Sequence, residues 1–354
     1  MINKIILRSK KLLWHKGIFR EKKNPNPTIW GIIGLGYMAE TFATAIDGNK
    51  NGIIGAVASR SLTKAKCFAN KHGNCKYYGA YEAMINDSSL KLDIIYIATP
   101  VNLHYEHIKL CLNAGKNVLC EKPITASSEQ LLELIKLAQK NKCFFMEGMW
   151  MKCLPTFITA SKWIQNGNIG NVEFIRTDFD KRRVLDNTIN AKHGVLLDYG
   201  VYAIAFILNY LDVKDEIEIS YVSRKDQRRE DTNWQIAVHS NGINATINLS
   251  SNFKSQSKAV VIGSKGFIEW ESQFNRTNTV TLYDNFGKKI KTSKYNYKYE
   301  GFEYEIDEVQ KCLKQNLTEC SVVSLSASLS TMKIIDVLLK TQENGLERRN
   351  ILLD

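Results

Sequence analysis

Nearly pure apolar runs alternate with amphipathic helical stretches from residue 28 to about residue 150. Short, wholly apolar runs are typical of strands that are covered on both faces. Strands that alternate with helices are joined by crossover connections, so this pattern predicts a doubly wound parallel sheet. The predicted strands are 28–35, 53–58, 76–78, 93–98, 117–120 and 143–146, and the predicted helices are 39–46, 62–71, 81–85, 104–114 and 127–140.

From about residue 151 the pattern changes to short runs in which apolar and polar residues alternate. Turn sequences such as Asn241-Gly242 separate the runs. This pattern predicts an α+β domain built on a large, mostly antiparallel sheet with one open face. We expect strands at 172–179, 216–223, 234–239, 243–249, 259–262, 267–270 and 280–283, and helices at 155–166, 195–209, 303–314 and 324–341. The expected domains are therefore 28–150 and 151–354.

The positive charge of the chain is concentrated at its N-terminal end. The net charge is +12, of which residues 1–23 carry +7. A stiff Asn24-Pro25-Asn26-Pro27 segment closes this basic arm, which we define as residues 1–27. One interpretation is an arm that becomes ordered against a partner or subunit, and the other is a weak contact with an anionic membrane surface. No nucleic-acid recognition motif accompanies the charge, so we expect no nucleic-acid partner.

The remaining composition is that of an ordinary globular protein, with 44% hydrophobic and 24% charged residues. No apolar run approaches the roughly 20 residues that span a bilayer. The eight cysteines are scattered, without a C-x-x-C pair or a matching histidine spacing. We therefore expect reduced thiols, a cytoplasmic protein and no metal site.

A glycine-rich segment, Gly34-Leu35-Gly36-Tyr37-Met38-Ala39, lies between the first predicted strand and helix. The G-x-G-x-x-A spacing in this position is typical of a Rossmann dinucleotide-binding turn. Gly34 allows the tight turn, Gly36 lets backbone N–H groups approach a pyrophosphate, and Ala39 permits close helix–strand packing. We expect cofactor contacts from this segment, including Tyr37 and Met38.

The second predicted strand ends at Ser59-Arg60-Ser61. NAD-preferring sites usually have Asp or Glu here, to accept a hydrogen bond from the ribose 2′-hydroxyl. A guanidinium instead pairs with a 2′-phosphate, so Ser59 and Arg60 favour NADP over NAD. The alternative is that Arg60 is a solvated loop residue.

Four motifs appear in the order typical of the Gfo/Idh/MocA oxidoreductases, which the chain resembles from about residue 28 to about residue 345. A further stretch, from Met146 to Pro155, and the Tyr that ends the last motif resemble the branch of dimeric dihydrodiol dehydrogenases and NADP-dependent D-xylose dehydrogenases most closely. The four motifs are Gly34-Leu35-Gly36-Tyr37-Met38-Ala39, Ala98-Thr99-Pro100-x-Asn102-x-His104, Glu121-Lys122-Pro123 and Asp198-Tyr199-Gly200-Val201-Tyr202.

The resemblance implies a role for each motif residue. It places Lys122 beside the nicotinamide and the reacting carbon, with Tyr202 as the acid/base and Asp198 one helical turn before it. A tyrosine is a weak base at neutral pH unless a nearby ammonium stabilises its phenolate. Asp198 as a structural cap and Tyr202 as a core residue stay open as alternatives. The other implied contacts are Thr99, Pro100, Asn102, His104 and Glu121 for the cofactor, and Trp150 and Phe179 for the substrate.

These residues predict an NAD(P)-dependent oxidoreductase that transfers a hydride between a nicotinamide and a hydroxyl-bearing carbon of a sugar or sugar derivative. The open sheet face predicts a homodimer or a dimer of dimers. The chain departs from its relatives at Ala191-Lys192-His193 and at Lys152, which add bulk and charge. These departures leave a nucleotide-sugar dehydrogenase or reductase as one alternative. A non-catalytic NADP-binding sensor, which would keep the glycine turn but not the chemistry, is the other.

Overall fold

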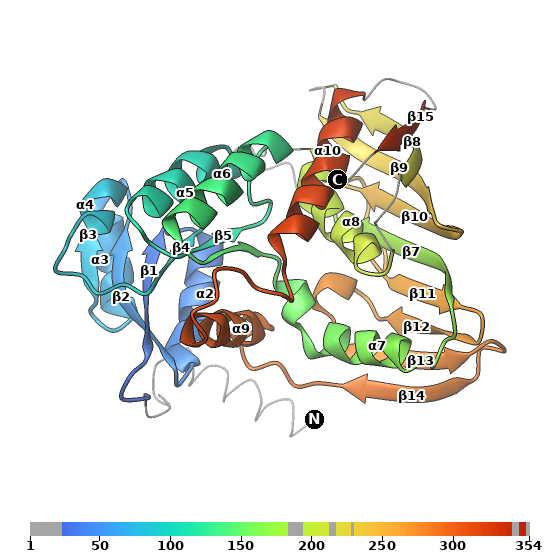
Figure 1. Ribbon diagram of the computed structural model, residues 1–354, viewed down its shortest axis with the longest axis horizontal. Coiled ribbons are helices and arrows are strands. Elements are labelled where there is room, and N and C mark those ends of the chain that lie inside the picture. Colours follow the sequence, from blue (N-terminus) through green and yellow to red (C-terminus); the bar gives the residue numbers. More distant parts are fainter. Residues whose placement is uncertain (1–22, 183–193, 212–216, 228–229, 342–346, 352–354) are drawn as a thin grey trace. The chain divides into compact units, whose positions relative to one another are not determined.

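Figure 1 shows a computed structural model of the chain, which describes residues 23–182, 194–211, 217–227, 230–341 and 347–351. These residues form two compact units. Unit 1 contains the described residues up to Ala126, with Gln130–Trp150 and Lys298–Ser321. Unit 2 contains Ser127–Glu129, Met151–Tyr297 and the described residues from Val322 onward. Residues 1–22 of the basic arm and the 191–193 segment lie outside the described residues.

Unit 1 is built on a six-stranded parallel sheet with the order β3-β2-β1-β4-β5-β6. Every residue of β4 and β5 is buried, as expected for strands covered on both faces. The strand order reverses between β1 and β4, which is where doubly wound sheets bind their ligands. The strands are β1 (Thr28–Ile33), β2 (Gly52–Ala58), β3 (Lys76–Tyr78), β4 (Ile94–Ile97), β5 (Val118–Glu121) and β6 (Phe145–Gly148). This sheet confirms the predicted Rossmann fold.

Helices between and beyond these strands supply the apolar layers. α2 buries a stripe that includes Phe42 and Ile46, and α9 packs against α2 although it comes from far along the chain. The Phe42 ring stacks on Tyr96 of β4 at 3.8 Å and meets Phe302 of α9 edge-on at 6.0 Å. The helices are α2 (Tyr37–Gly48), α3 (Leu62–Lys71), α4 (Tyr81–Ile85), α5 (His104–Asn113), α6 (Ser128–Asn141) and α9 (Phe302–Lys314).

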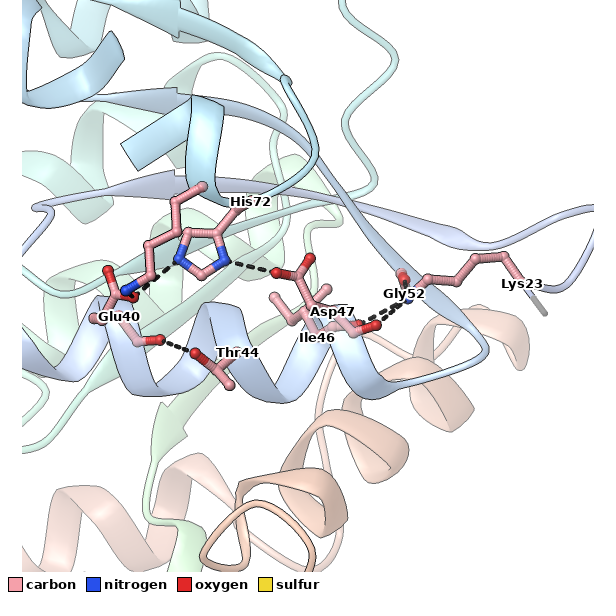
Figure 2. A network of polar contacts seen from close by, with 8 residues as sticks. Lys23, Glu40, Thr44, Ile46, Asp47, Gly52 and His72 are labelled. Carbon is pink, nitrogen blue, oxygen red and sulfur yellow. Dashed lines mark hydrogen bonds and ion pairs between the residues drawn. The ribbon is translucent and has the colours of Figure 1, made fainter. Parts of the chain in front are cut away.

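Charged side chains contact α2 and the segment that follows it, as Figure 2 shows. The Lys23 ammonium lies 2.6–3.0 Å from the carbonyl oxygens of Ile46, Asp47, Asn49 and Gly52, which share its three N–H donors. The buried His72 ring lies 2.6 Å from a carboxylate oxygen of Asp47 and 3.2 Å from one of Glu40. A cation at the last turn of a helix satisfies its terminal carbonyls and complements its dipole. Lys23, the last basic residue of the arm, therefore anchors the chain to unit 1.

Unit 2 is built on a nine-stranded sheet with the order β14-β13-β12-β11-β7-β10-β9-β8-β15. β7 and β10 pair in parallel, and the other neighbours pair antiparallel. The sequence did not predict the strands at the two edges, β14 and β15. The strands are β7 (Val172–Asp180), β8 (Ile217–Lys225), β9 (Asp231–Ser240), β10 (Ile243–Ser250), β11 (Ala259–Gly263), β12 (Gly266–Trp270), β13 (Thr279–Asp284), β14 (Lys289–Lys294) and β15 (Glu347–Ile351).

Helices cover one face of this sheet. α7 (Pro155–Gln165) packs against β13 and β14, α8 (Val201–Leu208) packs against β7 and β10, and α10 (Leu325–Lys340) packs on α8. The helix expected at 195–209 is split: Leu196–Gly200 forms a π-helical turn, and α8 follows. The α/β fold with a mostly antiparallel second sheet is thus confirmed. Among the described residues, no helix combines the length and hydropathy needed to cross a membrane.

Candidate active site

The glycine-rich turn follows β1 at the edge of the sheet where the strand order reverses. Gly34 has φ +82°, and a Cβ there would lie 2.6 Å from the backbone nitrogen of Thr99. The fold itself therefore requires glycine at position 34. Gly36 has an extended backbone that any residue adopts, and a Cβ there would meet no atom of the described residues within 4 Å.

Gly36 is therefore unexplained by its neighbours, whereas an approaching ligand would explain it. It begins α2, whose first-turn N–H groups and positive dipole end attract an anion. Tyr37 is 78% exposed and Met38 is half-buried, while Ala39 is fully buried under the sheet. This cradle fits the pyrophosphate of a dinucleotide.

The end of β2 carries Arg60, which is exposed, between Ser59 and Ser61. The Ser61 hydroxyl accepts the N–H of Lys64 and caps α3. Tyr81 begins α4 beside Arg60: burial raises the pKa of the Tyr81 hydroxyl, while the nearby Arg60 charge lowers it. The guanidinium therefore lies close to the Tyr81 hydroxyl.

Two residues that the sequence did not single out complete this corner. The Tyr81 ring meets the His107 ring edge-on at 4.7 Å, and the Nδ1 atom of His107 lies 2.9 Å from the hydroxyl of Thr99. Burial lowers the pKa of His107. Arg60, Tyr81, His107 and Thr99 therefore connect the ends of β2 and β4. The sequence offered one signal for Tyr81: it comes directly after the Gly79-Ala80 turn that follows β3, a strand of the same sheet.

His104 ties together two loops at the same sheet edge. It is 1% exposed; its Nδ1 lies 2.9 Å from the Pro123 carbonyl oxygen and its Nε2 lies 2.7 Å from the Thr99 carbonyl oxygen. Burial lowers the pKa of His104 to about 4, so the ring is neutral at pH 7 and donates to one of the two carbonyls. Pro100 and Asn102, in the loop that His104 holds, are exposed.

Glu121 and Lys122 stand at the carboxyl end of β5. The Tyr96 hydroxyl donates to one carboxylate oxygen of Glu121 at 2.5 Å, and the Lys122 backbone N–H donates to the other at 3.2 Å. Burial raises the pKa of Glu121, whereas the Tyr96 hydrogen bond and the Lys122 charge lower it. The Glu121 side chain is therefore fixed from two sides, and Lys122 stays half-buried beside it.

A second and a third buried acid lie in unit 1. Glu147 on β6 accepts the N–H of Ile124 at 3.1 Å. Glu305 on α9 is fully buried, and neither of its carboxyl oxygens has a hydrogen-bond partner among the described residues. Burial, and then the charges of Glu121 and Glu147, raise the pKa of Glu305 well above its ordinary value. Nothing in the sequence pattern signalled this acid.

Trp150 lies two residues after the end of β6, in unit 1. It is 7% exposed, and its ring stacks on Phe302 of α9 with centroids 4.7 Å apart and planes 6° apart. The contact covers one face of the indole.

Asp198, Tyr202 and Phe179 lie in unit 2. Asp198 is half-buried in the π-helical turn, and Tyr202 is 6% exposed in the first turn of α8. The Tyr202 ring stacks on Phe179 of β7 at 5.8 Å, and Tyr199 stacks on the same ring at 5.1 Å. Strand and helix together hold the two phenols parallel to Phe179.

Asp231 fixes the start of the π-helical turn. Its Oδ2 atom accepts the N–H of Leu196 at 2.8 Å and the indole N–H of Trp234 at 2.7 Å. A Cβ at Gly194 would lie 1.2 Å from the other carboxylate oxygen of Asp231, so only glycine fits there. His193, one residue earlier, is outside the described residues.

Two family models match most of this chain. Residues 29–149 match the oxidoreductase family with an NAD-binding Rossmann fold, and residues 157–269 match the Gfo/Idh/MocA C-terminal domain. The chain belongs to the Gfo/Idh/MocA oxidoreductase family. It is an NAD(P)-dependent oxidoreductase, and its first unit is the NAD-binding Rossmann domain, as the motifs predicted.

Named relatives fall in the predicted branch. The trans-1,2-dihydrobenzene-1,2-diol dehydrogenase of Xenopus tropicalis is 28% identical over 329 residues, covering 88% of this chain and 97% of its own length. The enzyme of the same name from Homo sapiens is 27% identical over 324 residues, covering 88% and 96%.

Solved structures share the fold. A 3-ketoreductase from Actinomadura kijaniata in complex with NADP and TDP-benzene has a TM-score of 0.78 at 22% identity, covering 89% of this chain and 98% of that one. An oxidoreductase from Agrobacterium radiobacter in complex with NAD+, L-tartaric acid and magnesium has a TM-score of 0.78 at 15% identity, covering 93% and 99%.

Proposed function

We propose that this oxidoreductase uses NADP(H) to transfer a hydride to or from a hydroxyl-bearing carbon of a sugar or sugar derivative. One observation carries the proposal. The Gly34–Gly36 turn follows β1, the Pro100–Asn102 loop follows β4, and the Glu121-Lys122 pair stands at the end of β5. These three strands are neighbours in a parallel sheet. The carboxyl ends of parallel neighbours meet at one edge, so a dinucleotide on the turn extends towards Lys122.

The cofactor's nicotinamide, when bound, supplies the hydride acceptor or donor. Glu121, held by Tyr96, and the exposed Pro100 and Asn102 would hold its ribose. The exposed Arg60 guanidinium at the end of β2 would pair with the 2′-phosphate of NADP. NAD is the alternative cofactor.

The remaining chemistry is proton transfer at the substrate hydroxyl. We propose that the Lys122 ammonium holds the substrate oxygen as negative charge develops there, and that the Tyr202 hydroxyl takes or gives the proton. Asp198 would orient Lys122 or a neighbouring substrate hydroxyl. Trp150 and Phe179 would offer aromatic faces to the apolar side of a sugar ring.

The substrate class rests on what similar proteins bind. The named relatives act on a cyclic vicinal diol, and sugars present the same pair of neighbouring hydroxyl groups. The ketoreductase structure holds a thymidine diphosphate derivative. A nucleotide sugar is therefore the second candidate substrate.

Turnover tests this proposal. The purified protein is mixed with NADP+ or NADPH and a panel of vicinal diols, pentoses, hexoses, their keto forms and nucleotide sugars, while absorbance of the reduced cofactor is followed. Tyr202→Phe should lower kcat by about 10²- to 10⁴-fold, the usual contribution of a positioned acid or base. The matched control is Tyr199→Phe, which removes the other hydroxyl above Phe179 and should retain activity. Lys122→Ala should lower kcat, as Tyr202→Phe does.

Absence of turnover with every compound, combined with thermal stabilisation by NADP+, would instead indicate a cofactor-binding sensor. Equal activity of Tyr202→Phe and Tyr199→Phe would remove Tyr202 from the mechanism.

Cofactor choice has its own test. Arg60→Ala should raise the KM for NADP+ by about 10- to 100-fold, the equivalent of one charge-assisted hydrogen bond, and leave the KM for NAD+ nearly unchanged. Lys64→Ala, which removes an exposed charge from the first turn of α3, shortly after Arg60, is the control. An equal effect of Arg60→Ala on both cofactors would refute the assignment.

We further propose that the sheet face of unit 2 opposite α7 and α8 joins two copies of a cytoplasmic protein. Phe267 and Tyr283 stack there at 4.6 Å, and both are only half-buried. Light scattering should give the mass of a dimer or tetramer, and Phe267→Asp should shift it towards the monomer.

A further inference from the structure

Three side chains of the types that ligate metals, one carboxylate and two thiols, converge in unit 1 at the C-terminal end of α9. Glu308 and Cys312 are one turn apart on this helix, and Cys320 comes from the segment that follows it. The two sulfur atoms and a carboxylate oxygen all lie within 4.8 Å of one another. The cysteines are 2% and 0% exposed, whereas the Glu308 side chain is 19% exposed and opens the cluster to solvent.

The chain path that creates the cluster is well defined. The N–H groups of Gln315 and Leu317 both bond the Cys312 carbonyl, and Asn316 takes a left-handed conformation with φ +53°. The helix therefore ends in a tight reversal that returns the chain alongside α9. The Thr318 carbonyl then accepts the N–H of Phe145 on β6, which anchors the returning segment to the sheet. Cys320 is thus held opposite Cys312 by backbone contacts.

We propose that Glu308, Cys312 and Cys320 form a binding site for one thiophilic divalent cation, for which Zn²⁺ is the probe. Thiolate and carboxylate are both zinc ligands, and two sulfurs with one oxygen leave a fourth position for solvent. Tetrahedral Zn²⁺ with bonds of about 2.3 Å to sulfur separates two ligands by about 3.8 Å. The side chains therefore need to close by about 1 Å at most, which rotation of the side chains supplies.

A disulfide is the competing use of two neighbouring cysteines, and the third side chain argues against it. A carboxylate has no role in a disulfide, but it is a ligand for a cation. On binding, the cation displaces one proton from each thiol, so two protons pass to the buffer while two sulfur–metal bonds and one oxygen–metal bond form.

The ammonium of Lys311 would compete with a metal ion for the carboxylate of Glu308. It lies 3.0 Å and 3.3 Å from the two carboxylate oxygens of Glu308 and occupies the ligand that faces solvent. Removal of this exposed charge should free Glu308 for the metal. A merely structural cluster would not respond in this direction.

The experiment is a titration of the reduced, metal-free, untagged full-length protein with Zn²⁺ in competition with a chromophoric chelator. We expect one Zn²⁺ per chain. Cys312→Ser and Cys320→Ser should weaken binding by at least about 100-fold, and Glu308→Gln by about tenfold. Lys311→Met should tighten binding by about two- to fivefold. Cys143→Ser, at another buried cysteine of unit 1, should bind like the original protein.

A parallel titration with Cd²⁺ reports the ligand type, because cadmium–thiolate bonds absorb in the ultraviolet and cadmium–carboxylate bonds do not. The absorption should appear with the original protein and disappear with Cys312→Ser. Absence of stoichiometric Zn²⁺ binding would overturn the proposal, as would equal binding by Cys143→Ser and the two ligand variants. If the cysteine variants do not fold, Glu308→Gln and Lys311→Met still decide it, because their effects must have opposite signs.

Discussion

The fully buried Glu305 should make the stability of this protein fall as pH rises, and Glu305→Gln should remove that dependence. Neither carboxyl oxygen of Glu305 has a hydrogen-bond partner among the described residues, and its pKa is raised well above the ordinary value of 4.5. The native state therefore keeps a proton that the unfolded chain loses above pH 4.5. Since the unfolded state binds fewer protons in this window, each pH unit costs the native state about 1.4 kcal/mol.

The magnitude follows from that slope. Between pH 5 and pH 7 the free energy of unfolding of the original protein should fall by about 2.5 kcal/mol relative to that of Glu305→Gln, as long as the native carboxyl keeps its proton. Glutamine has no ionisable group and nearly the same shape, so any cost of its buried amide is a constant offset. Glu121, whose pKa is also raised, is present in both proteins, and its ionisation is the same in both as long as Glu305 carries no charge.

Urea denaturation at half-unit pH steps from 5 to 8 measures the effect, with the unfolding free energy obtained by linear extrapolation. Glu106→Gln makes the same chemical change at an exposed position of α5 and should leave stability unchanged within about 0.5 kcal/mol. Parallel pH profiles for the original protein and Glu305→Gln would refute the reasoning, because they would mean that Glu305 ionises equally in the folded and unfolded chain.

Two further changes test contacts that place α2 and α9. Lys23→Met removes the ammonium that binds carbonyls of the last turn of α2 and of the loop after it, and should cost about 2 to 4 kcal/mol of unfolding free energy. Lys50→Met, at an exposed position nearby, should cost under about 0.5 kcal/mol, and equal losses would contradict the anchoring role of Lys23. Phe302→Ala removes a ring that is 3% exposed and stacks on Trp150, and should cost about 3 to 5 kcal/mol with a change in tryptophan fluorescence. Phe302→Leu, which fills most of the space, should lose clearly less, and a loss equal to that of Phe302→Ala would show that packing volume is not the cause.

The sequence by itself determined the parallel sheet of unit 1 and the position of its glycine turn. Strands such as Ile94–Ile97 are buried on both faces, so every residue is apolar and the pattern is unambiguous. The Gly34 and Gly36 spacing is equally local, because a tight turn and an open helix start are properties of a few consecutive residues. The family motifs could be read for the same reason.

The polar edges of the second sheet could not be read this way. β14 is Lys-Ile-Lys-Thr-Ser-Lys, with five exposed residues and one half-buried one, and β15 at the other edge is Glu-Arg-Arg-Asn-Ile. An edge strand gains its structure from backbone pairing with a single neighbour, and charged side chains protect it from pairing with other molecules. Its sequence therefore carries little hydrophobic alternation.

Tertiary structure alone decided which distant residues meet. The packing of α9 against α2 brings Phe302 to Trp150 and buries Glu305, and the reversal at Asn316 brings Cys320 to Cys312 and Glu308. The chain from Lys23 reaches the end of α2, and Tyr81 and His107 link Arg60 to Thr99. Each of these contacts joins segments whose own sequence patterns do not signal the contact. Its energy depends on burial and on the charge of the partner, which exist only once the chain has folded.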